Sequence, residues 1–355
     1  MYSESDLQSA VEAGAISPQA ADALRAHVAN QRSSPVVDEE HFRLLTGFND
    51  IFVSIAGIIL LVAVAGLGNL VRLGAADHQP SVLCGVLVAA TSWGLAEYFT
   101  RVRRMALPSI VLLLGFSGGI ACALMAMMMQ IFPHADDRLS ATLTAGAALV
   151  TAGATWLHWR RFMVPITVAV GAVAGAAVVV ALLYAAFPAM DDGIFWLVLA
   201  GGVGIFLLAM RWDMSDRART TRRADVAFWL HLAAAPAIAH STFRLLGVFG
   251  GGDMGGGTAV TVLALYVAFG LVALAIDRRA LLVSSLAYVL FAMYALFEAM
   301  GSVELSAAFT ALVIGSALLL LSAFWHKARK LVVEGLPEGM RMRLPYLDRD
   351  VPAAA

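Results

Sequence analysis

Charged residues, and lysine above all, are scarce in this chain, and the scarcity excludes an ordinary soluble protein. Only 14% of the 355 residues are charged, whereas soluble domains carry about 25%. Only two of the 24 basic residues are lysine, and the formal net charge is −1. No overall positive field would attract nucleic acid, so we expect no nucleic-acid partner. Apolar residues take the place of the missing charge and make up 60% of the chain.

Cysteine is equally scarce, and no catalytic signature is present, so we expect no enzyme, no metal site and no cofactor. Cys84 and Cys122 both fall inside apolar segments, which indicates small buried side chains rather than a disulfide. Cys122, Met125 and Met129 have the spacing of one helical face, and soft sulfur ligands suit Cu(I). Methionine is also an ordinary filler of apolar packing, and the sequence has no second sulfur cluster to complete a copper site.

Long uncharged apolar runs are what the sequence has instead. The run IFVSIAGIILLVAVAGLGNLV from Ile51 to Val71 is long enough, as a helix, to cross a hydrocarbon core of about 30 Å. Nine similar segments follow, so we predict an all-α, polytopic transmembrane helix bundle. The ten predicted spans are 51–73, 81–99, 106–132, 139–157, 163–187, 193–211, 226–248, 258–276, 280–299 and 305–325.

The distribution of basic residues predicts the orientation of this bundle. If the N-terminus is cytoplasmic, 21 of the 24 lysines and arginines lie on the cytoplasmic side. The other three are Arg72, Arg138 and Arg244, and the alternation holds at every loop. The positive-inside rule therefore favours ten spans with both the N-terminus and the C-terminus in the cytoplasm.

Four regions follow from this pattern. Residues 1–37 are predicted to form a cytoplasmic helical hairpin and linker, with Ser17 as the N-cap of the second helix. Residues 38–50 form an interfacial lead-in helix, residues 51–325 form the transmembrane domain, and residues 326–355 form a basic cytoplasmic tail. The hairpin is too small to fold alone, so we expect a protein partner or the membrane to hold it.

The seventh predicted span is the richest in polar residues, which at membrane depth are candidates for function. His240 and Arg244 are four residues apart and share a helix face. They predict a polar pocket that opens outward, in which Arg244 binds an anion and His240 carries a proton or donates a hydrogen bond. The alternative is a histidine bonded to a neighbouring helix and an arginine that reaches the outer head groups. His231 lies on the opposite face unless Pro236 bends the helix, and we expect it to tolerate alanine better.

Two further polar residues lie near span ends. Glu97 precedes Arg101 by four residues, the favourable order for a helix-surface pair, although an ion-coupling carboxylate is the other interpretation. Gln130 lies near the outer boundary of the third span, where a helix–helix hydrogen bond explains it as well as a binding role does.

The ends of the chain carry a resemblance to known sequences. DLQSAVEAGAISPQAADAL, a glycine-punctuated first span and MMMQIFP resemble the opening of a family of predicted bacterial multipass membrane proteins of unknown function. The tail WHKARKLVVEGLPEGMRMRLP is similar to the ends of related multipass proteins. The resemblance covers about the first third and the tail, and implies a short N-terminal helical hairpin before the bilayer segment. It implies no functional residue.

Two functions remain open at this point. Ten spans divide into five plus five, and an odd repeat inverts, as in many secondary transporters, so a small-solute transporter or permease is the leading hypothesis. The alternative is a non-transporting membrane sensor or scaffold that uses the cytoplasmic hairpin and tail. The expected location is the bacterial cytoplasmic (inner) membrane. The expected partners are the lipid bilayer, a small solute and a protein partner for the hairpin.

Overall fold

The computed structural model describes residues 9–24, 48–71, 81–187, 193–219, 221–247, 256–299 and 306–347. Over these residues the protein is all-α and has no strand, as the sequence predicts. The chain divides into two compact units, Met1–Phe48 and Asn49–Ala355, which we describe separately.

The first unit has helical residues 9–12 and 18–24 in its described part. Gly14 lies in the turn between them with φ of +70°, a left-handed conformation that favours glycine. Ser17 Oγ accepts a hydrogen bond from the Ala20 backbone N–H at 3.1 Å, which confirms the predicted cap of the second helix. Residues 38–47 of the predicted lead-in helix lie outside the described residues.

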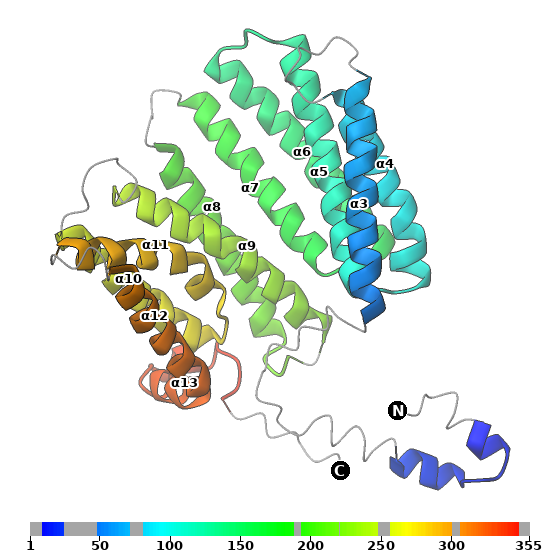
Figure 1. Cartoon of the computed structure of the whole chain (residues 1–355), viewed down its shortest axis with the longest axis vertical. Helices are drawn as coiled ribbons and strands as arrows, with labels where there is room; N and C mark the ends of the chain where they lie inside the picture. The colour runs from blue at the N-terminus through cyan, green and yellow to red at the C-terminus, as the bar shows by residue number, and fades with distance from the viewer. Residues whose placement is uncertain are drawn as a thin grey trace. The chain divides into compact units, whose positions relative to one another are not determined.

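The second unit is a succession of helices (Figure 1). They are α3 (Phe48–Leu70), α4 (Val82–Ala96), the π-helix η1 (Glu97–Val102), α5 (Ala106–Ile131), α6 (Asp137–Phe162), α7 (Ile166–Ala186), α8 (Gly193–Ser215), α9 (Arg222–Leu245), α10 (Gly256–Ile276), α11 (Ala280–Ala299), α12 (Ser306–Ala323), α13 (Trp325–Glu334) and α14 (Glu338–Arg341). The most extensive packing joins α4 to α5, α6 to α7, α8 to α9 and α10 to α11. Helix α9 also packs against α7 and α11, which makes it the most buried of the candidate spans.

Six helices in the described part of the chain are long and apolar enough to cross a membrane, namely α3, α4 with η1, α5, α7, α8 and α9. A seventh is added if Thr310–Ala323 and Trp325–Glu334, bent by 76°, count as one span. Helix α6 falls short because its polar threonines and its glycines lower its mean hydropathy. Every predicted span coincides with a helix, but the count of ten and the sides of the termini stay predictions.

Glycines set the close packing of α4 against α5. A Cβ built on Gly119 of α5 would lie 2.7 Å from both the Ala89 backbone nitrogen and the Gly85 carbonyl oxygen. Even one methyl group has no room there, so the backbones of the two helices approach as they do at small-residue interfaces in membranes.

Candidate functional site

Among the described residues, charged and titratable side chains gather in a buried cluster. They come from the end of α8 and the segment after it, from α9, from the turn between α10 and α11, and from α13. Each of these side chains is at most 6% exposed. We call this group the ionic cluster; its members are Asp213, Arg219, His231, Asp277, Arg278 and Arg329.

Asp213, in the last turn of α8, is the centre of the ionic cluster. Its Oδ1 accepts a hydrogen bond from Arg278 Nη2 at 2.8 Å, and its Oδ2 lies 2.9 Å from His231 Nε2. Arg219 Nε lies 3.8 Å from Oδ1. One carboxylate therefore joins α8 to α9, to the turn before α11 and to the segment that follows α8.

Arg219 and Asp277 form the second half of the ionic cluster. Arg219 Nη1 donates to Asp277 Oδ2 at 2.9 Å, and its Nη2 donates to the Ile276 carbonyl at 2.8 Å. Both residues have left-handed backbones, with φ of 54° and 57°. That conformation costs an ordinary L-residue about 1–2 kcal/mol, so the surrounding bonds have to hold it. The ion pair joins the two strained turns directly to each other.

The described part of the predicted C-terminal tail, together with Trp325 just before it, folds back onto this cluster. Trp325 Nε1 donates to Asp277 Oδ1 at 2.8 Å. Arg329, 2% exposed, donates to the backbone carbonyls of Pro345 at 2.9 Å and Tyr346 at 3.1 Å. The buried guanidinium satisfies two carbonyls that have no helical partner, so α13 and the residues after α14 are held together at the cluster.

His231 differs from its expected role. Its ring is 2% exposed, and Nε2 is the nitrogen bonded to Asp213, so it carries the hydrogen. Among the described residues, Nδ1 has no hydrogen-bond partner. The buried carboxylate of Asp213 depends on this ring for one of its hydrogen bonds. We therefore expect His231→Ala to be poorly tolerated, in contrast to the prediction from the sequence.

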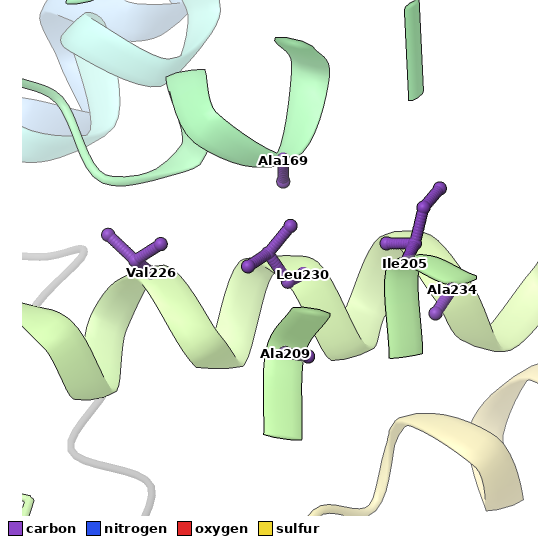
Figure 2. Packing of buried hydrophobic residues seen from close by; sticks show 6 residues of the cluster. All are labelled: Ala169, Ile205, Ala209, Val226, Leu230 and Ala234. Carbon is purple, nitrogen blue, oxygen red and sulfur yellow. The ribbon is translucent and has the colours of Figure 1, made fainter. Parts of the chain in front are cut away.

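Small and aliphatic side chains of α7, α8 and α9 form a core (Figure 2). His231 of the ionic cluster follows Leu230 of this core along α9. Val226, Leu230 and Ala234 occupy successive turns of α9 and meet side chains from α7 and α8. We call this core the plug; its residues are Ala169, Ile205, Ala209, Val226, Leu230 and Ala234. All are at most 7% exposed, so these six side chains pack closely against one another and exclude water from between them.

A pocket of about 520 Å³ lies between α6, α7, α8 and α9, beyond the plug. That volume is within the range of about 300–1,000 Å³ that small-molecule sites occupy. Its lining begins at the start of α6 and the end of α7, with Asp137, Ser140 and Tyr184, and reaches Ile205 of the plug. Along α8, Ile205 lines the pocket and Asp213 follows eight residues later, about 12 Å away at 1.5 Å per residue.

His240 and Arg244 share a face of α9, as the sequence predicts, but neither lines this pocket. His240 Nδ1 lies 2.7 Å from the Tyr288 hydroxyl on α11, and its ring is 6.0 Å from that of Phe195. The Arg244 guanidinium carbon lies 5.0 Å from the centre of the Phe195 ring. Both side chains are exposed, an arrangement closer to the alternative of a histidine bonded to a neighbouring helix than to a shared anion pocket.

Glu97 pairs with Arg101 at 3.4 Å, as its spacing predicts, and also with a residue that the spacing could not indicate. Arg161, at the end of α6, donates to both carboxylate oxygens at 2.8 and 2.9 Å. This two-pronged bond fastens η1 to α6 and gives Glu97 a role in packing. Gln130 is half-buried in the last turn of α5.

The described residues contain no group of three or more histidine, cysteine or acidic side chains placed to hold a metal ion. Cys84 is buried and Cys122 half-buried, and both are free thiols.

The sequence does contain a signal for the ionic cluster. Asp213 is followed by Asp216 and Arg217, and Asp277 by Arg278, just beyond the ends of two predicted spans. The orientation is predicted by counting lysines and arginines alone, so that count does not register these aspartates. Comparison with protein-family models, with curated proteins and with solved structures found no match to the chain.

Proposed function

We propose that this protein is a small-solute transporter of the bacterial inner membrane, with ten spans and both ends in the cytoplasm. The observation that supports it is the order of three features along α8, counted from its first residue. A pocket of about 520 Å³ comes first, the plug follows, and the buried ionic cluster is last. In the predicted orientation the pocket is on the outer side and the ionic cluster is on the cytoplasmic side.

This order is what a transporter with its outer gate open requires. A solute enters the pocket and meets the plug, whose small side chains leave no room for it. Passage to the cytoplasm then needs α8 and α9 to separate. This breaks the bond of Asp213 to His231 and the link that Arg278 makes between Asp213 and the Ala224 carbonyl of α9. Buried ion pairs suit such a gate because they fix one arrangement while closed and can regain water once opened.

The topology is tested with a reporter enzyme that is active only outside the cytoplasm. Fused after Asp137 or Asp192 it should be active, and fused after Arg161 or Arg279 it should be silent, because 21 of 24 basic residues then stay inside. Equal activity at two successive loops would refute the ten-span arrangement.

Alternating access is tested by labelling single cysteines after Cys84→Ala and Cys122→Ala remove the native thiols. We expect Ala177→Cys, which lines the pocket, to react with a membrane-impermeant methanethiosulfonate added outside, because water reaches it and permits the thiolate. Val179→Cys, two residues away, is 57% exposed and does not line the pocket, so it should face lipid and stay unreactive.

The same reagent added on the cytoplasmic side tests the gate. Ala234→Cys in the plug is fully buried and should react slowly, only when the gate opens. Asp277→Asn weakens the bond from Arg219 while it keeps the shape of the side chain, and should speed that reaction several-fold. If Ala234→Cys stays unlabelled in folded protein both with and without the Asp277→Asn change, the gate does not open and the sensor or scaffold alternative is favoured.

A further inference from the structure

The charge of the pocket between α6 and α9 defines a class of ligand. Asp137 is the one charged residue among the described residues that line it, and Ser140, Thr144 and Tyr184 are the other polar ones. Three of the four lie near the start of α6, and Tyr184 lies near the end of α7. The remaining lining is apolar. The pocket therefore has an acidic end, formed by α6 and α7, and is apolar over the rest of its lining.

The neighbouring aspartates Asp136 and Asp137 have different roles at this end of the pocket. Asp136 Oδ1 accepts a hydrogen bond from the Leu139 backbone N–H at 2.7 Å, so it caps α6. Asp137 is in the first turn, is exposed, and lines the pocket. Asp136 makes the capping bond, so Asp137, which lines the pocket, is not the residue that caps α6.

We propose that this pocket binds an amphiphilic organic cation, with its positive group near Asp137 and its apolar body between α7 and α8. The inference rests on the proposed function and names the substrate class of the transporter. A carboxylate next to apolar walls attracts a cation more strongly than it would in open water. The Tyr184 ring at the same end offers a cation a second favourable surface.

The opposite charge is disfavoured by the same lining. The described lining residues include no arginine, lysine or histidine that could bind an anion. The anion expected from the sequence depends on Arg244 and His240, which lie against Phe195 and Tyr288 away from this pocket. An anionic ligand in the pocket would bring its charge toward Asp137 with no compensating cation.

Two ions of the same shape and opposite charge test this inference. We would measure binding of tetraphenylphosphonium and of tetraphenylborate to the full-length protein in phosphatidylglycerol nanodiscs by equilibrium dialysis, with empty nanodiscs subtracted. No lipid in that sample carries a cationic group that could occupy the site. We expect saturable binding of tetraphenylphosphonium at one site, and no saturable binding of tetraphenylborate.

Substitutions at the two aspartates then locate the site. Asp137→Asn should weaken tetraphenylphosphonium binding on the order of tenfold, the loss of one partly screened ion pair. Asp136→Asn removes the same charge one residue away but keeps a good N-cap, and should change the affinity less than about twofold. Ala177→Phe, which fills the pocket, should abolish binding while the melting temperature shows that the protein is folded.

Three results would overturn the inference. They are equal effects of Asp136→Asn and Asp137→Asn, saturable binding of tetraphenylborate in place of tetraphenylphosphonium, and binding of neither ion. None of these results decides whether the gate opens, because cytoplasmic labelling of Ala234→Cys measures that without a ligand.

Discussion

Asp213→Ala is expected to destabilise the protein more than any other single change described here. The substitution leaves Arg278 and His231 buried without the carboxylate that bonds both of them at 2.8 and 2.9 Å. Removing one partner from a buried ion pair typically costs about 3–5 kcal/mol, because the remaining charge cannot regain its hydration. Thermal unfolding of the detergent-solubilised protein, followed by size-exclusion chromatography, measures the loss.

A second variant separates this explanation from a simple cavity. If the cost comes from the unpaired charge, then Asp213→Ala combined with Arg278→Ala should cost less than the sum of the two single changes. Glu334→Ala is the control, since its pair with Lys330 is exposed and 3.9 Å long, and such pairs contribute about 0–1 kcal/mol. A double variant whose loss equals the sum would contradict the assigned role of the ion pair.

Gly119→Ala is expected to loosen the packing of α4 against α5. Its new Cβ would lie 2.7 Å from the Ala89 backbone nitrogen and the Gly85 carbonyl oxygen, and backbone atoms cannot turn aside as a flexible side chain can. The helices must move apart, which in an overpacked core costs about 1–3 kcal/mol. The melting temperature of the purified variant should fall accordingly.

The neighbouring residue provides a matched control. A Cβ on Gly118 meets no atom within 4 Å, although Gly118 belongs to the same helix. Gly118→Ala should therefore be neutral or stabilise α5 by up to about 1 kcal/mol, because alanine loses less backbone freedom in a helix. If the two substitutions change the melting temperature equally, close backbone contact is not the reason for glycine at position 119.

Local patterns in the sequence are confirmed where one helix decides the outcome. The Ser17 cap, the pair of Glu97 with Arg101, and the shared face of His240 and Arg244 all depend on residues three or four apart. A regular helix fixes the relative positions of such residues whatever packs around it. A helix also occupies every predicted span, because a long apolar run in a membrane satisfies its backbone hydrogen bonds within itself only as a helix.

Contacts between different helices could not be predicted from the spacing of residues within one helix. Arg161 reaches Glu97 from 64 residues away, and Asp213 meets Arg278 from 65 residues away. The sequence shows that these residues lie at the ends of apolar segments on one predicted side, but each end has several possible partners. Which ones meet depends on the order in which the helices pack, and no periodicity within one helix carries that information.

The sequence by itself determined that the chain is all-α and contains helices suited to a membrane, because long uncharged runs satisfy their backbone hydrogen bonds only as helices in such surroundings. The tertiary structure alone decided which polar residues are buried together. It gave His231 a carboxylate partner, left His240 and Arg244 outside the pocket, and placed Asp137 in its lining. The physical reason is that a membrane-depth charge or an enclosed cavity is a property of several helices at once, and it exists only after they have packed.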